Sequence, residues 1–332
     1  MDPRSSELFS RLSRCTAATG TSTGCAMAAS EPASVFTLSS LWSSSNALCE
    51  EPDSPCASAS AGDAQLGPPE ADTQHWPRFH SVWGAQPDDA AARWRASMRW
   101  RADQRMDSAL GCPQPFFHFS KGAYPHAFHK RCRDGSLLHL ERADHFAALV
   151  SACAAAEVPA EEAAMHVARL NEYLASLDPR PFPGGRVVRI VDCEDLSLWQ
   201  MSSSVVTFAR VFARTVGAHY PERSSKILVV NAPSSFALVF SLLSSLFSRK
   251  LLDKVTVFSV AQQEAAHAAL RDLVAPENLP VAYGGSCACA GPGGCWRNAP
   301  EERDLWRTVE EATPLDIRRR GSWTTDEDDG DG

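Results

Sequence analysis

Apolar and polar segments alternate most regularly between residues 219 and 259. A short apolar run from Lys226 to Asn231 predicts a buried strand, and a Pro-Ser-Ser break follows it. Apolar side chains then recur at helical spacing over residues 236–247, which predicts a helix. A second strand is expected over residues 255–259, where Val, Thr and Phe predominate. The segment therefore predicts one strand–helix–strand unit.

The helix predicted over residues 236–247 is apolar on every side. Leu238 and Leu242 lie opposite the main apolar stripe, and no charged residue interrupts the helix. Such a helix is buried in protein, inserted in a membrane, or placed over an apolar molecule that is not protein. The Asn-Ala-Pro break before it argues against a membrane span. The stripe consists of Phe236, Val239, Phe240, Leu243 and Phe247.

The remaining pattern alternates strands with helices. This order predicts an α/β fold with a largely parallel sheet, preceded by helices over residues 75–105 that place Trp94 and Trp100 toward a core. Strands are expected at residues 136–141 and 186–192, and helices at residues 143–156, 160–177, 202–216, 261–273 and 300–321.

Composition narrows the class of protein. The chain has 332 residues with a net charge of −8, which argues against a nucleic-acid partner because such proteins need a basic surface. Eleven cysteines without a secretory signal indicate reduced thiols in a compartment such as the cytoplasm.

Both ends of the chain differ from its centre. Residues 1–73 are rich in Ser, Ala and Gly without sustained periodicity, so we expect this segment to be disordered. Its first thirty residues, which carry Arg4, Arg11 and Arg14, resemble an organelle transit peptide, but Asp2 and Glu7 argue against that interpretation. The acidic run at residues 326–329 is also expected to be disordered.

No arrangement of residues suggests catalysis, a cofactor or a metal. The sequence lacks a G-x-S-x-G elbow, a P-loop and a dinucleotide-binding glycine motif. Cys287, Cys289 and Cys295 offer three ligands without a histidine nearby in the sequence, and His126 and His129 are placed on an approach loop. We therefore expect neither an enzyme nor a metal site.

Four short blocks together resemble the CRAL-TRIO domain of the yeast-type phosphatidylinositol transfer proteins. They occur in the order and at nearly the spacing of that family. They are Tyr124-Pro125 with His129-Lys130 and Asp134-Gly135, the run His219–Arg223, the run Asn231–Pro233, and Pro276–Pro280 followed by Tyr283-Gly284-Gly285.

The resemblance implies a domain organisation. A shortened helical lobe is expected over residues 74–112, and a CRAL-TRIO lipid-binding domain over residues 113–296. A C-terminal helix and the acidic tail would fill residues 297–332. In this family the all-apolar helix is the gate of a lipid cavity.

A lipid cavity also has a physical rationale. A two-chain phospholipid carries roughly 30 methylenes, each costing about 0.8 kcal/mol when exposed to water, so its carrier needs a closed apolar cavity with a mobile lid. Apolar strand positions would line that cavity. The candidates are Leu138, Leu140, Val188, Ile190, Ile227 and Val229.

The resemblance also implies a headgroup site. The carboxylate and the cation of the family's inositide site correspond to Glu222 and Lys254, whereas two further polar positions fall on Leu251 and Trp83. A surface ion pair between Glu222 and Lys254 is an equally good explanation. All four polar positions of the family's phosphatidylcholine site have changed, so binding of that lipid is not carried over. They fall on Phe128, His139, Val187 and Arg189.

Together these features predict a protein that binds a phospholipid, with phosphatidylinositol favoured, and transfers or presents it. It would be a cytoplasmic monomer that touches membrane surfaces transiently. The alternative is a sensor or adaptor that holds another hydrophobic ligand without transferring it. A lipid hydrolase ranks third, because the sequence offers no catalytic group.

Overall fold

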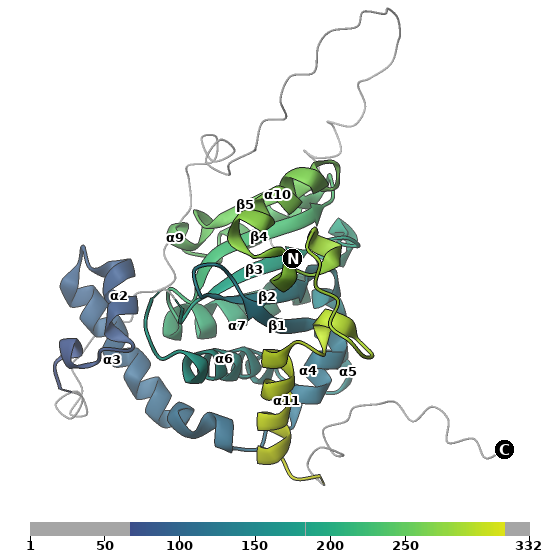
Figure 1. Cartoon of the computed structure of the whole chain (residues 1–332). Coiled ribbons are helices and arrows are strands. Elements are labelled where there is room, and N and C mark those ends of the chain that lie inside the picture. Colours follow the sequence, from purple (N-terminus) through teal and green to yellow (C-terminus); the bar gives the residue numbers. More distant parts are fainter. Residues whose placement is uncertain (1–66, 183, 316–332) are drawn as a thin grey trace, which may run out of the picture. The chain divides into compact units, whose positions relative to one another are not determined.

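The computed structural model describes residues 67–182 and 184–315 (Figure 1). The expectations of a disordered amino-terminal segment, a transit peptide and an acidic tail concern residues outside this range, apart from residues 67–73. Residues 69–71 form a short 3₁₀ turn within the folded part.

A five-stranded sheet forms the centre of the molecule, with the strands in chain order from one edge to the other. The first two strands pair antiparallel, and each later strand joins its neighbour in parallel. The expected α/β fold with a mostly parallel sheet is confirmed. The strands are β1 (His126–Arg131), β2 (Leu137–Arg142), β3 (Val187–Asp192), β4 (Ser224–Ala232) and β5 (Val255–Ser259).

Strand β1 was not predicted, and the placement of His126 and His129 on a loop is wrong. This strand is short and contains four basic or imidazole side chains, so its sequence has no apolar alternation. Both histidines are nevertheless buried. The strand forms because its hairpin partner β2 and the helices around it cover it.

The helices expected from the sequence lie close to their predicted positions, except that the last one ends at Ala312 instead of residue 321. Two short helices, over Phe116–Ala123 and Arg249–Leu252, were not predicted. The amino-terminal helices are α2 (Trp76–Trp83), α3 (Pro87–Asp103), α4 (Phe116–Ala123), α5 (Phe146–Ala155) and α6 (Ala160–Leu177). The later helices are α7 (Ser203–His219), α8 (Phe236–Ser244), α9 (Arg249–Leu252), α10 (Gln263–Leu273) and α11 (Pro300–Ala312). No helix within the described residues is long and apolar enough to cross a membrane.

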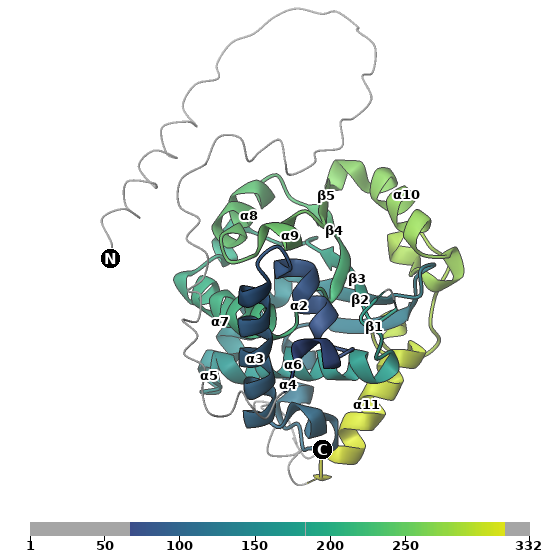
Figure 2. The same ribbon diagram turned by 90° about the vertical axis from the view of Figure 1, so that its left-hand side faces the viewer.

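Different helices cover the two faces of the sheet (Figure 2). Helix α10 covers one face, where Leu270 and Ala266 pack against side chains from the four strands β2–β5. On the other face α6 and α11 cover the end near β1, where Tyr173 and Leu305 pack against Phe128. Helices α7 and α8 lie on this second face, toward β4 and β5 (Figure 2).

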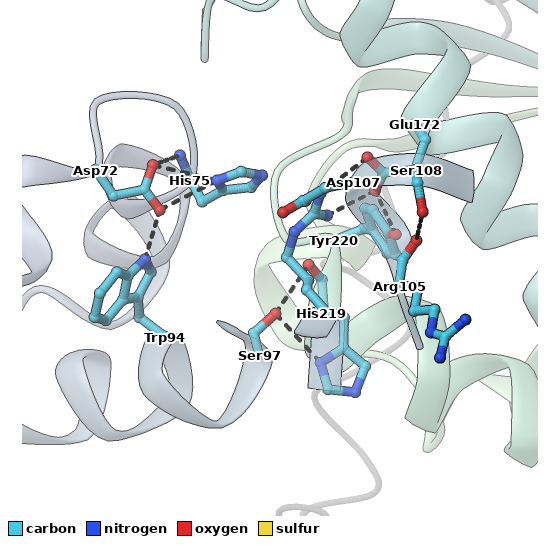
Figure 3. A network of polar contacts seen from close by, with 11 residues as sticks. Asp72, His75, Trp94, Ser97, Arg105, Asp107, Ser108, Glu172, His219 and Tyr220 are labelled. Carbon is cyan, nitrogen blue, oxygen red and sulfur yellow. Dashed lines mark hydrogen bonds and ion pairs between the residues drawn. The ribbon is translucent and has the colours of Figure 1, made fainter. Parts of the chain in front are cut away.

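Polar contacts fasten helix α3 to the rest of the fold (Figure 3). Arg101 of α3 binds Glu172 of α6, with 2.6 Å between Nη1 and Oε1. Tyr220 donates to the same oxygen at 2.6 Å, and Trp100 stacks on His219 with ring centroids 4.0 Å apart. The lobe expected from the sequence is therefore pinned to α6 and to the end of α7.

Candidate functional site

Glu222 is the centre of a polar cluster at the edge of the sheet where β3, β4 and β5 begin. Its side chain is 8% exposed and its Oε1 lies 2.7 Å from Nζ of Lys254. Lys250 and Arg186 lie farther out, at 3.9 Å and 4.0 Å from its carboxylate oxygens. Glu222 adopts a left-handed backbone conformation with φ of 59°. Such a φ is uncommon for a residue with a side chain.

Two buried arginines lie behind this carboxylate. Arg78 of α2 is 2% exposed and donates to the backbone oxygens of Glu222 at 3.0 Å and Gly185 at 2.8 Å. Arg223 is 5% exposed and also donates to Gly185, at 3.4 Å. Burial, followed by the like charges of Arg223 and Arg186, lowers the pKa of Arg78. Burial likewise lowers the pKa of Arg223 to about 10.

The cluster holds more positive charge than Glu222 can balance. Arg78, Arg186 and Arg223 each have a buried Nε without a hydrogen-bond partner among the described residues. Buried charges without full pairing are costly, so such an arrangement favours an anionic ligand. A phosphate group would accept charge-assisted hydrogen bonds from these cations.

The sequence identified Glu222 and Lys254 but missed Arg78, Arg186 and Lys250. A usable signal existed for Arg186, because Arg186, Arg223 and Lys254 each directly precede a strand of the parallel part of the sheet. The starts of parallel strands meet at one edge. Arg78 gave no such signal, because it comes from a helix distant in sequence.

An apolar strip runs from this cluster along β4 and β5. Ile227 pairs in register with Val255, and Val229 pairs with Val257. Val255 and Val257 are only half-buried, and they pack with Val229 and with Phe236 of α8. The strip is thus a partly open apolar surface beside α8, with the cations at one end.

Four of the six expected cavity residues lie on the opposite face of the sheet. They pack against α10, in a closed core with Leu270 and Val274. Side chains alternate between the faces of a strand, so the even-numbered positions of β2 and β3 cannot face α8. The expectation that these four line a cavity is therefore corrected, whereas Ile227 and Val229 lie on the α8 face. The four are Leu138, Leu140, Val188 and Ile190.

The predicted gate is shorter than expected. Helix α8 ends at Ser244, and Phe247 lies beyond it with 39% exposure. Val239 is buried, whereas Phe236, Phe240 and Leu243 are half-buried. This stripe therefore faces the protein without being enclosed by it.

The outer side of α8 is apolar as well. Leu238 and Leu242 are each 41% exposed. Trp199, which is 95% exposed, lies on a 3₁₀ turn that contacts α8. A tryptophan and leucines exposed together are typical of surfaces that bind membranes or proteins.

Two hollows in the structure are small. One of about 260 Å³ lies at the start of β4 and includes Arg133 and Lys226, and the other of about 330 Å³ lies between α5 and α7. Neither is lined by α8. Drug-sized ligands already need about 300–1,000 Å³, so neither hollow accommodates two acyl chains.

A second polar cluster lies on β2 and β3, among the positions that the resemblance assigned to a phosphatidylcholine site. Glu141 is held by Arg189 and by Nδ1 of His139, which is 2.7 Å away, and Tyr124 donates to it at 3.3 Å. Burial alone would raise the pKa of Glu141, but Arg189 and His139 lower it to about 2. Phe128 and Val187 belong to the apolar core beside α6. On this face near β2, Glu141 is therefore paired with Arg189 and His139 in one polar network.

Comparison with known proteins identifies the central segment. Residues 123–285 match the family model described as the CRAL/TRIO domain. These residues are a CRAL/TRIO domain. The domain contains all five strands and helices α5–α10, together with both polar clusters described above apart from Arg78.

The curated relatives are distant. The chain is 25% identical over 207 residues to the phosphatidylinositol/phosphatidylcholine transfer protein SFH11 of Arabidopsis thaliana, covering 60% of this chain and 53% of that protein. It is 24% identical over 221 residues to the protein real-time of Anopheles gambiae, covering 66% of this chain and 32% of the relative. It is 32% identical over 92 residues to the Sec14 cytosolic factor of Schizosaccharomyces pombe, covering 28% and 30%. The chain spans about half or less of the length of these relatives.

A similar solved structure is the crystal structure of Sfh5. The TM-score is 0.49 at 13% sequence identity, and the match covers 70% of this chain and 78% of the other.

Proposed function

We propose that this CRAL/TRIO protein binds a phospholipid and exchanges or presents it at membrane surfaces, with phosphatidylinositol as the favoured ligand. The observation that supports this most is the excess of cations around Glu222, which continues directly into the apolar strip on β4 and β5. A phospholipid likewise has a charged headgroup that continues directly into apolar acyl chains. Two of the relatives carry lipid transfer or Sec14 in their names, which supports the same class of function.

The cluster favours an inositol headgroup over a choline headgroup. Lys250, Lys254 and Arg186 are cations suited to the phosphate, and the Glu222 carboxylate can accept hydrogen bonds from ring hydroxyls. Arg78 brings a cation from the helical lobe, where the sequence suggested that one was missing. A choline group offers no hydroxyl to Glu222, and the positions for it near β2 hold the paired network around Glu141.

Contact with the membrane would use the outer side of α8. Trp199, Leu238 and Leu242 expose apolar surface on the outer side of α8, opposite the stripe that faces β4 and β5. Inserting them between lipids would move α8 and open a path to the apolar strip. We expect acyl chains to enter when α8 moves, because neither of the two hollows lies beside α8.

The location of the protein follows the same proposal. The seven cysteines among the described residues form no disulfide with one another, and we propose a reducing compartment such as the cytoplasm. A monomer is expected to suffice, because the cluster and the strip come from one chain.

Native mass spectrometry of the full chain tests the proposal directly. Purified protein should carry a co-purified phospholipid, and phosphatidylinositol should displace it more completely than phosphatidylcholine. Vesicle exchange then separates transfer from sensing, since a transfer protein moves labelled lipid between vesicles and an adaptor only retains it. Absence of any bound lipid after incubation with phosphatidylinositol vesicles would overturn the proposal.

A further inference from the structure

Three cysteines and a histidine converge beside β1, away from the cluster around Glu222. They are His129 of β1 and Cys287, Cys289 and Cys295 of the loop that follows α10, and their ligand atoms all lie within 4.8 Å of one another. We infer that these four side chains bind a zinc ion. The inference is independent of the lipid proposed above.

The distances between the four ligand atoms agree with tetrahedral coordination. Zinc–sulfur bonds of about 2.3 Å and zinc–nitrogen bonds of about 2.0–2.1 Å place two sulfurs about 3.8 Å apart and a sulfur and a nitrogen about 3.5 Å apart. The Sγ atoms of Cys287 and Cys289 are 3.6 Å apart. Nε2 of His129 lies 3.6 Å from the first and 3.7 Å from the second. Three edges of the tetrahedron thus already have nearly the right length.

The fold presents His129 to the cysteines through a bulge. The pairing of β1 with β2 shifts between His129 and Arg131, and Lys130 takes a left-handed φ of 30°. Glu301 of α11 holds this bend by accepting from the Lys130 backbone N–H at 3.0 Å. The bulge lets His129, which is fully buried, direct Nε2 at the sulfurs. Bulges commonly redirect a side chain in this way.

The backbone turns of the loop after α10 bring Cys295, the last of the four ligands, back toward Cys287. Cys287 is fixed by a bridge to Pro280, with its N–H donating to Leu279 at 3.0 Å. Gly291, Gly293 and Gly294 all adopt positive φ, which glycine tolerates best. These turns bring Cys295 back, and its Sγ lies 3.4 Å from the backbone oxygen of Cys287.

The loop over residues 284–298 has few buried side chains to stabilise it. Between residues 284 and 298 only Cys287 is buried, so the loop has almost no apolar core of its own. Small segments without a core are commonly stabilised by a metal. Four protein ligands leave no open coordination position, which is the arrangement of structural zinc sites rather than catalytic ones. The ion would fasten the loop after α10 to β1.

The sequence alone could not reveal this site. Three cysteines in a C-x-C-x₅-C pattern lack a fourth ligand, and His129 lies 158 residues before Cys287. Only the pairing of β1 into the sheet brings the histidine to the loop.

Metal analysis of the full chain tests the inference. The protein is purified under reducing conditions without added metal, and zinc is measured by inductively coupled plasma mass spectrometry. We expect about one zinc per chain, a loss of most of it in Cys289→Ser, and no change in Cys112→Ser, which alters a free cysteine outside the loop. Zinc below a tenth of the protein concentration in the unaltered chain, or equal loss in both variants, would overturn the inference.

A second measurement covers the case in which Cys289→Ser fails to fold. The unaltered chain is stripped with a chelator and reloaded with cobalt, and its absorption is recorded. Coordination by three thiolates should give intense thiolate-to-cobalt charge-transfer bands that one equivalent of zinc removes. Absence of these bands, or a disulfide between two of the three cysteines in peptide mass spectrometry of the freshly purified protein, would also overturn the inference.

Discussion

Glu222 combines an uncommon backbone conformation with an uncommon charge environment. Its φ of 59° costs free energy that only the surrounding structure can offset. The backbone bond from Arg78 and the ion pair with Lys254 supply that support. Conformational strain with surplus positive charge is typical of a binding site rather than of a stabilising surface ion pair.

Replacing Lys254 by Ala tests the headgroup role. A charge-assisted hydrogen bond contributes about 1.5–3 kcal/mol, so phosphatidylinositol loading should fall by roughly tenfold or more. Loading of a lipid with an uncharged headgroup should change little, because its acyl chains provide the binding energy. Quantitative lipid analysis after vesicle incubation measures both.

Lys226→Ala is the matched control for that variant. Lys226 lies on β4 near the same edge of the sheet but is exposed and lines the small hollow beside Arg133. The Lys226→Ala variant should leave phosphatidylinositol loading unchanged. Equal losses for both lipids in Lys254→Ala would mean that Lys254 supports only the fold.

His219 should make stability depend on pH. Burial, then the charge of Arg101, lowers its pKa from 6.5 to about 4. Between these two pH values the unfolded chain binds more protons than the folded one, so stability decreases as the pH falls from about 6.5 to about 4. The shift corresponds to roughly 3 kcal/mol at most. Urea unfolding at several pH values measures the slope.

His219→Phe should reduce this slope while keeping the stacking on Trp100. Part of the slope will remain, because burial also lowers the pKa values of His126, His139 and His166. An unchanged slope in the variant would show that His219 is not held neutral by the contacts drawn in Figure 3.

At the scale of elements, α8 carries no charged residue, and its apolar side chains are mostly half-buried on the inner side and exposed on the outer side. Its inner residues Phe236 and Phe240 pack ring against ring, with centroids 5.8 Å apart. Only Val239 is fully buried. A helix with so little burial is suited to move.

Phe240→Asp should prevent lipid loading at modest cost in stability. Phe240 is half-buried, so an opened α8 can expose the carboxylate to water. Val239→Asp is the matched comparison one residue away, because Val239 is 3% exposed and its charge would be buried. Thermal unfolding should show a clearly larger loss for Val239→Asp. Equal unfolding by both variants would mean that α8 belongs to the core.

The sequence predicted elements with apolar periodicity well and others poorly. Helix α6 and strand β5 begin and end at their expected residues because their apolar spacing is regular. Strand β1 was missed because contacts with α11, such as Glu302 to the Phe128 backbone at 2.9 Å, stabilise a sequence rich in His and Lys. The end of α8 was placed too late, since apolar residues continue beyond Ser244 without helical geometry.

The candidate site was predictable only in part for a similar reason. Glu222 and Lys254 belong to short blocks that can be recognised in the chain. Arg78 and His129 act with residues more than a hundred positions away, and no local pattern reveals such partners. Which face of the sheet a strand residue occupies also depended on where α8 and α10 pack, so Leu138 and Val188 were assigned to the wrong face.

At the scale of the whole molecule, Asp72 fixes where the folded part begins. Its carboxylate accepts from Nε1 of Trp94 at 2.8 Å and from the backbone N–H of His75 at 2.9 Å (Figure 3). Burial alone would raise the pKa of Asp72, but the hydrogen bonds from His75 and Trp94 lower it. We therefore propose a domain boundary before Asp72 rather than after residue 73.

Two truncations test this boundary. Removing residues 1–66 should leave the unfolding temperature of the chain unchanged, because the described contacts of the helical lobe all remain. Removing residues 1–73 leaves Nε1 of the buried Trp94 without its acceptor, which costs about 1–3 kcal/mol. A chain of this size then loses about 2–4 °C per kcal/mol in differential scanning calorimetry. In the chain that lacks only residues 1–66, the Asp72→Asn variant separates the effect of charge from that of hydrogen bonding. The Asn amide oxygen can still accept from Trp94, so this variant should retain most of the stability. Identical unfolding of both truncations would show that Asp72 does not anchor the lobe.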